Sequence, residues 1–199
     1  VLFEVPTGVF ADTRGRRFSF LLGAATLLVS TLLYLLMWQV RAPFYGWAIA
    51  SILLGLGFTF FSGATEAWLV DALRATGFVG GLEPVFARGQ VITGIGMLTG
   101  SVAGGYIAQA TNLGVPFVLR AIILAVMFVV ALAFMRDIGF KPAPRGHPFA
   151  EMRSIAADSI EYGWRVPQVR YLMLAAPFTG GVGIYVFYAL QPYLLELYG

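Results

Sequence analysis

The stretch GVFADTRGRR, residues 8–17, places three arginines and one aspartate in an otherwise apolar chain. Directly after it, residues 18–40 contain no charged side chain. A run of this length is sufficient for a helix to cross a bilayer, which takes roughly 20 mostly apolar residues. The charged stretch therefore marks one end of a predicted membrane-spanning helix.

The composition of the whole chain agrees with this prediction. The 199 residues are 59% hydrophobic and 12% charged, whereas a typical soluble domain has about 25% charged residues. So few charges cannot cover a globular surface, and an integral membrane protein is predicted. The absence of cysteine excludes a disulfide framework and a thiolate metal site. The first residues do not resemble a signal peptide and are interpreted as the tail of a helix whose start is missing.

Further uncharged runs predict additional spans. They cover residues 42–65, the first part of 89–119, about 115–135, and 171–195. In the span predicted over about 115–135, the uncharged run is 121–135, and Arg120 directly before it has a long side chain that can reach the interface. With residues 1 to about 11 as a stump, the predicted fold class is all-α, a polytopic transmembrane bundle of five complete spans.

The distribution of basic residues predicts the orientation. Of the 13 lysines and arginines, Arg41 and Arg120 fall on one side of the predicted spans and the others fall on the opposite side. Because basic loops are retained in the cytoplasm, the richer side is predicted to be cytoplasmic. If the stump is numbered helix 2 and the spans 3 to 7, loops 2–3, 4–5 and 6–7 are cytoplasmic. The predicted location is the plasma or inner membrane.

Residues 137–168 are predicted to form a cytoplasmic linker. From His147 onward, apolar side chains recur at mostly helical spacing until Pro167, which favours an amphipathic surface helix. This helix either lies on the membrane face or packs on the loops as a solvated linker. The chain has no cluster of histidines and neither a G-x-S-x-G nor a phosphate-loop motif. We therefore expect no enzymatic activity, no metal and no cofactor.

Placed between two spans, residues 8–17 resemble the loop motif G-x-L-A-D-x-x-G-R-[RK] of the major facilitator superfamily. Phe10 replaces the usual leucine. The resemblance implies a fragment of a twelve-helix transporter, in which 1–136 is most of the N-terminal half, 137–168 the inter-half loop and 169–199 helix 7. The missing helices of its own full-length chain would be its partners. The matching residues are Gly8, Ala11, Asp12, Gly15, Arg16 and Arg17.

The same stretch has a direct physical reading. Gly8 and Gly15 permit close helix approach and a tight turn, and Asp12 near a helix end can interact with a neighbouring helix dipole. Arg16 and Arg17 at the interface need an acidic partner, and Asp71 lies at the same predicted level. The resemblance implies a gating charge cluster of Asp12, Arg16 and Asp71. The alternative is plain positive-inside topology with solvated arginines.

A second informative stretch is GIGMLTGSVAGG, residues 94–105. Its glycines at every fourth position predict a ridge for close helix packing. It also resembles the helix 5 antiporter motif of the same family, although Ser101 stands where that motif has proline and Ala87 where it has an upstream glycine. Dinucleotide binding is disfavoured because no strand precedes the glycines. The matching residues are Gly96, Gly100, Gly104 and Gly105.

Two acids are candidate coupling or substrate residues. Glu66 lies five residues before Asp71, inside the predicted span, where an ionisable group is unfavourable and points to a function. It is predicted to couple protons or to recognise a cationic substrate, or else to form a structural ion pair with a nearby arginine. Glu4, on the stump, is a second candidate with the same two interpretations.

The resemblance implies secondary active transport of a small molecule by alternating access. The partial helix 5 motif and an aromatic, charge-poor interior favour proton-coupled efflux of drug-like or amphipathic compounds. The alternatives are a solute importer of the same superfamily and a non-transporting membrane scaffold or sensor. The expected partners are the small-molecule substrate, protons and the lipid bilayer, with no nucleic acid.

Overall fold

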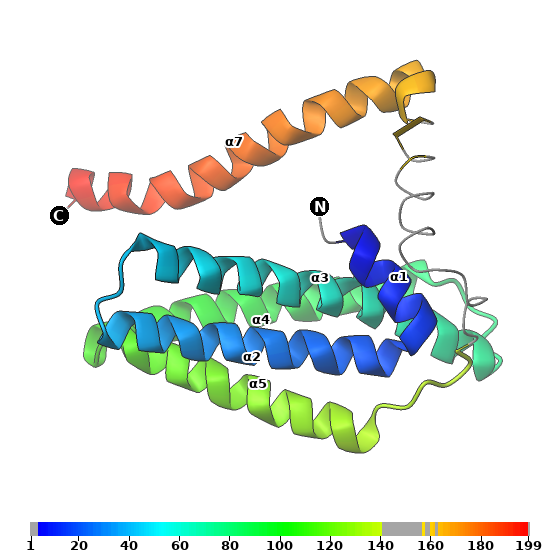
Figure 1. Cartoon of the computed structure of the whole chain (residues 1–199), viewed down its shortest axis with the longest axis horizontal. Coiled ribbons are helices and arrows are strands. Elements are labelled where there is room, and N and C mark those ends of the chain that lie inside the picture. Colours follow the sequence, from blue (N-terminus) through cyan, green and yellow to red (C-terminus); the bar gives the residue numbers. More distant parts are fainter. Residues whose placement is uncertain (1–3, 141–156, 158–159, 162, 199) are drawn as a thin grey trace. The chain divides into compact units, whose positions relative to one another are not determined.

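A computed structural model describes residues 4–140, 157, 160–161 and 163–198. The chain divides into two compact units, Val1–Pro148 and Phe149–Gly199. The first unit contains α1 (Glu4–Arg14), α2 (Arg16–Gln39), α3 (Phe44–Ala75), α4 (Glu83–Ala110) and α5 (Gly114–Phe134), and the second contains α7 (Pro167–Tyr198) (Figure 1). The described residues hold no strand, and the predicted all-α class is confirmed.

The predicted spans correspond to long helices. Within the described residues, α2, α3, α4 and α5 are long and apolar enough to cross a membrane. The uncharged run 89–119 is broken by a turn between α4 and α5, as its length indicated. The fifth predicted span lies on α7, so a helix is confirmed there, and its membrane crossing stays a prediction.

The predicted linker is only partly described. Most of the surface helix expected from His147 onward lies outside the described residues. Val166 interrupts the helical residues before α7, and α7 begins at Pro167. Proline is favoured in the first turn of a helix, where its missing N–H is not needed. The predicted division of the chain at residues 136 and 168 stays a prediction.

A single residue separates α1 from α2. Gly15 has φ +108° and ψ 149°, a backbone conformation that is essentially restricted to glycine. The stretch expected to be a loop between two helices is therefore helical on both sides of one corner, which Figure 1 shows.

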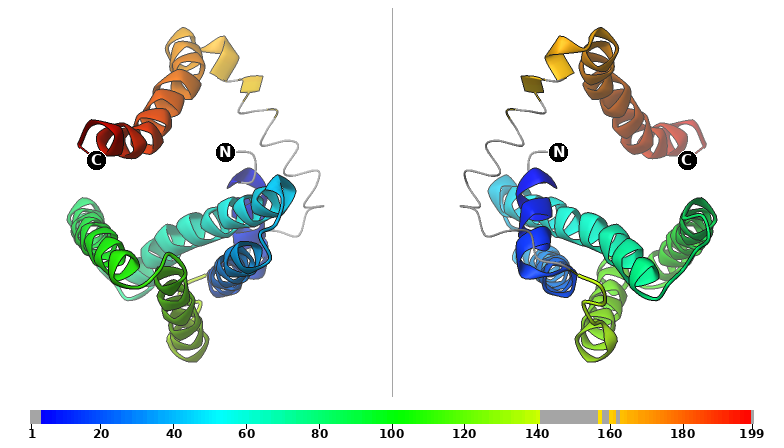
Figure 2. Two further views of the ribbon diagram at one scale, coloured as in Figure 1. Left: turned by 90° about the vertical axis from the view of Figure 1, so that its left-hand side faces the viewer. Right: turned by 90° about the vertical axis from the view of Figure 1, so that its right-hand side faces the viewer.

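Helix α2 packs against α1, α3 and α5, whereas α4 contacts only α5 among the described helices (Figure 2). Small polar side chains join α2 to α3. The buried Ser19 hydroxyl donates to the carbonyl of Phe60 at 3.3 Å, and the buried Ser30 hydroxyl donates to that of Ala50 at 2.8 Å. Such interhelical bonds stabilise helix pairs in lipid, where water offers no alternative partner.

Glycines bring α2 and α3 into backbone contact. A Cβ atom on Gly23 would lie 3.0 Å from the amide nitrogen of Phe61 and 3.1 Å from the carbonyl oxygen of Gly57. The predicted ridge on α4 makes no comparable approach, because its glycines have no atom within 4 Å of the Cβ position in the described part of the chain. The glycines that bring α2 and α3 together are thus Gly23 and Gly57, and not those of the predicted ridge.

Replacing Gly23 by alanine should force these two helices apart. We expect Gly23→Ala to lower the free energy of unfolding by about 1–3 kcal/mol, the usual effect of overpacking. The thermal unfolding midpoint of the purified protein in detergent measures the loss. The control is Gly55→Ala, since a Cβ at Gly55 meets no atom within 4 Å. Equal midpoints for the two variants would show that the Gly23 contact is not tight.

Candidate functional site

Arg16, the first residue of α2, lies between two acidic side chains. Its guanidinium forms an ion pair with Asp12 on α1, and its Nε lies 3.3 Å from Oδ2 of Asp71 on α3. The Arg16 side chain is only 16% exposed, whereas that of Asp12 is 50% exposed. One partly buried cation therefore joins the ends of three helices. We call Asp12, Arg16 and Asp71 the Arg16 cluster; the sequence predicted these three residues, and the structure brings them together.

Arg17 does not join this cluster. Its Nη2 donates to the carbonyl of Leu132 at 2.6 Å, in the last turn of α5. A helix C-terminus carries carbonyls without intrahelical partners and a partial negative charge, so it binds a cation well. The expected acidic partner of the Arg17 guanidinium is absent among the described residues, and a helix end takes that place.

Sequence reasoning did not identify the segment that follows α5. In this α5 extension (residues 135–140), Oδ1 of Asp137 accepts a hydrogen bond from the backbone N–H of Arg17 at 2.8 Å. The Arg136 carbonyl accepts one from Trp68 Nε1 at 2.7 Å, and the Phe140 ring centroid lies 5.7 Å from the Arg16 guanidinium carbon. The available signal was that Asp137 directly follows a span, on the same predicted side as Arg16.

Two glycines with positive φ permit these approaches. A Cβ on Gly15 would lie 2.6 Å from Oδ2 of Asp137, and one on Gly139 (φ +74°) would lie 2.6 Å from the carbonyl oxygen of Asp71. The expected tight turn is therefore found at Gly15. The close approach expected at Gly8 is absent from the described part of the chain, where no atom lies within 4 Å of its Cβ position.

The two coupling candidates lie apart from this cluster. Glu66 is exposed on α3 and forms no ion pair with the arginines that the structure describes. The side chain of Glu4, on α1, is outside the described part. The roles predicted for both residues stay predictions.

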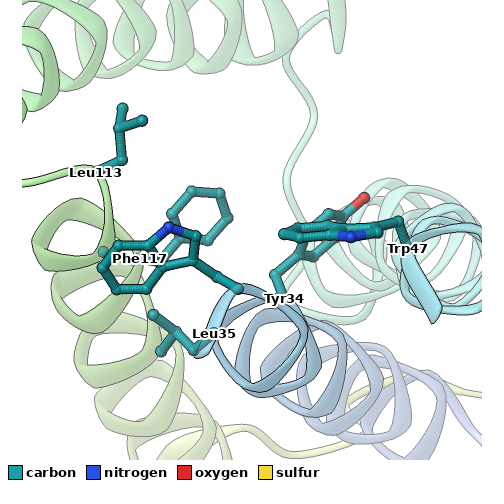
Figure 3. A pocket seen from close by; sticks show the side chains of 7 residues that line it. Tyr34, Leu35, Trp47, Leu113 and Phe117 are labelled. Carbon is teal, nitrogen blue, oxygen red and sulfur yellow. The ribbon is translucent and has the colours of Figure 1, made fainter. Parts of the chain in front are cut away.

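At the opposite end of α2, aromatic side chains surround a cavity of about 220 Å³ (Figure 3). The ring of Tyr34 lies 5.8 Å from those of Trp47 on α3 and Phe117 on α5, measured between centroids. No carboxylate, histidine, lysine or arginine lines the cavity, so it is best suited to apolar or aromatic groups. Its lining residues are Tyr34, Leu35, Trp38, Trp47, Leu113, Gly114 and Phe117. In the described part of the chain, no group of three potential metal ligands comes together.

Comparisons with known proteins identify the family. The family model described as Major Facilitator Superfamily matches residues 1–199. The chain is also similar to "Uncharacterized MFS-type transporter YxaM" of Bacillus subtilis (strain 168), with 25% identity over 202 residues that cover 99% of the chain and 47% of the relative. No solved structure matches. The chain belongs to the major facilitator superfamily.

Family membership confirms several expectations. The chain is a multi-pass membrane protein, consistent with its long apolar helices. Because this is a family of transporters, the expectation that the chain is not an enzyme is confirmed as well. The chain spans about half of the length of the relative that it matches.

Replacing Gly15 tests the corner between α1 and α2. We expect Gly15→Ala to destabilise the protein by about 1–3 kcal/mol because alanine is strained in this backbone conformation, with a further loss from displacement of the Asp137 carboxylate. The thermal unfolding midpoint in detergent is the measurement. Gly8→Ala is the matched control, because its Cβ has open space, and it should unfold at or above the wild-type temperature since alanine favours a helix over glycine. A wild-type midpoint for Gly15→Ala would contradict the corner geometry.

Proposed function

We propose that the protein is a secondary active transporter of a small molecule that works by alternating access, with the Arg16 cluster as a lock for one conformation. Family membership and the name of the relative, an MFS-type transporter, support the transport activity. The single observation that carries the lock is the guanidinium of Arg16 shared by Asp12 and Asp71. Because this cation joins α1, α2 and α3, a movement between them has to break an ion pair.

Asp12 is the member of the cluster suited to a further partner. Its side chain is half exposed although it is paired with Arg16. A carboxylate accepts several hydrogen bonds at once, so Asp12 has capacity for a donor from a part of the transporter outside α1–α5. We propose that Asp12 contacts the other half of the transporter in the locked conformation.

The Arg16 end of the bundle is proposed to face the cytoplasm. Arg14, Arg74, Arg88 and Arg136 lie at or near the helix ends on the Arg16 side of the bundle, whereas Arg41 and Arg120 lie nearer the opposite side. The positive-inside rule supports this orientation, with the plasma or inner membrane as the location.

Proton-coupled efflux of drug-like or amphipathic compounds is the specific activity that we propose. Glu66 supports proton coupling, because it is an exposed acid on a helix long enough to span the membrane. The partial helix 5 motif on α4 supports efflux, because Gly96, Gly100, Gly104 and Gly105 resemble the antiporter motif of the family. A solute importer of the same family would keep the lock and reverse the direction of net flux.

The lock is tested by removing one charge. Asp12→Asn and Asp71→Asn should each lower transport about tenfold, because a shift of roughly 1.4 kcal/mol between conformations changes their ratio tenfold. The measurement is uptake of ethidium, an amphipathic aromatic cation, into inverted membrane vesicles that contain the natural-length protein. The amount of protein in the membrane should not change.

Glu161→Gln is the control for these variants. Glu161 pairs with Arg165 at 2.5 Å in an exposed i,i+4 ion pair, and such surface pairs contribute little. Wild-type transport by Asp12→Asn or Asp71→Asn would overturn the lock. An absence of substrate-dependent flux in the wild-type protein would favour the scaffold or sensor function instead.

Glu66 is tested through the pH dependence of the same flux. If its carboxylate carries the coupled proton, Glu66→Gln should transport ethidium at a low rate that no longer varies with the imposed pH gradient. Glu83→Gln removes an exposed acid in the first turn of α4 and should keep the wild-type pH profile. A wild-type profile for Glu66→Gln would exclude Glu66 as the coupling residue.

A further inference from the structure

The start of α2 depends on an acceptor from another part of the chain. The first N–H groups of a helix have no intrahelical acceptor, and the N-cap residue of α2, Gly15, has no side chain to supply one. Asp137, which lies beyond the end of α5, fills this role through its 2.8 Å hydrogen bond from the N–H of Arg17. Aspartate is among the preferred N-cap residues, and its charge is favoured at a helix N-terminus.

The helix end that carries Asp137 is capped in return. The guanidinium of Arg17 donates to the carbonyl of Leu132 at 2.6 Å, and this carbonyl belongs to the last turn of α5, where intrahelical donors are lacking. The N-terminus of α2 and the C-terminus of α5 therefore satisfy each other's free backbone groups. Both bonds hold only if the two ends keep one relative position.

This reciprocal cap lies directly beside the proposed lock. Both sequence neighbours of Arg16 lie against the Asp137 carboxylate. Gly15 approaches it closely, and the backbone N–H of Arg17 donates a hydrogen bond to it. The α5 extension also touches the cluster, because the ring of Phe140 lies 5.7 Å from the Arg16 guanidinium carbon. The direction in which Arg16 leaves the backbone is thus set by residues that α5 and its extension hold.

We propose that Asp137 is a positioning residue of the transporter: by capping the start of α2, its carboxylate aims Arg16 at Asp12 and Asp71. This inference rests on the proposed function of the Arg16 cluster as a lock. The required property of residue 137 is a hydrogen-bond acceptor for the N–H of Arg17. Its negative charge is secondary.

The variants Asp137→Ala and Asp137→Asn separate these two properties. Alanine removes the acceptor, whereas asparagine keeps an oxygen acceptor, removes the charge and caps helices about as well as aspartate. Two quantities are measured on the natural-length protein. One is amide hydrogen exchange of the peptide that contains the first turn of α2, and the other is ethidium flux in inverted vesicles.

For Asp137→Ala we expect about fivefold faster exchange in the first turn of α2, the usual scale of a lost N-cap. Its flux should fall to that of Asp71→Asn, and the double variant should be no worse than either single variant because both act through Arg16. Asp137→Asn should stay close to the wild-type protein in both measurements. Glu161→Ala, an exposed acid outside the cluster, should change neither.

Three results would overturn the proposal. They are wild-type flux for Asp137→Ala, an asparagine variant as impaired as the alanine variant, and additive losses in the double variant. If Asp71→Asn lowers flux and Asp137→Ala does not, only the positioning role fails. If neither lowers flux, the lock itself fails.

A third variant covers the case in which Asp137→Ala does not accumulate in the membrane. Asp137→Thr keeps an acceptor, but its oxygen is one bond nearer to the backbone than Oδ1 of aspartate, so the hydrogen bond from the N–H of Arg17 should be weakened and not lost. For this variant we expect hydrogen exchange in the first turn of α2 to be faster than in the wild-type protein but by less than about fivefold. Its ethidium flux should lie between that of the wild-type protein and that of Asp71→Asn. Wild-type flux for Asp137→Thr together with faster exchange at α2 would overturn the proposal.

Discussion

Every helix end leaves backbone N–H or C=O groups without a partner, and the structure depends on how the ends around Arg16 satisfy one another. The start of α2 receives a carboxylate oxygen of Asp137, while the end of α5 receives the guanidinium of Arg17. The end of α3 contributes Asp71 to Arg16. Helices that span a membrane bring many such ends to the same level, so polar groups of one helix become the natural caps of the next.

Much of this arrangement could be predicted because membrane spans are encoded locally. Uncharged runs of sufficient length gave α2, α3, α4 and α5, and the charges at the boundaries gave Asp12, Arg16 and Asp71 as neighbours. Asp137 escaped prediction, since its partner is a backbone N–H that carries no sequence signal. The extent of helix in residues 8–17 was not predicted either, because charged residues are compatible with both a loop and a solvated helix end. Only the conformation of Gly15 distinguishes the two.

The two sets of glycines show what pattern alone leaves open. The glycine repeat at every fourth position on α4 predicts a packing ridge, whereas Gly23 and Gly57 belong to no such repeat. The close contact between α2 and α3 is nevertheless made at Gly23 and Gly57. Spacing shows that a helix can be approached closely. Which helix approaches it depends on the polar groups that fix the pair, here the buried hydroxyls of Ser19 and Ser30.

The corner at Gly15 also constrains how this part of the sequence can change in length. Each residue added to an α-helix turns the following side chains by about 100°. Since α1 and α2 share a junction of one residue, an insertion there has no loop to absorb it and would rotate Asp12 on α1 away from Arg16 on α2. Residues 76–82, between α3 and α4, form a connection that can take up an added residue without rotating either helix. Variation in length should therefore accumulate between α3 and α4 and be purged between α1 and α2.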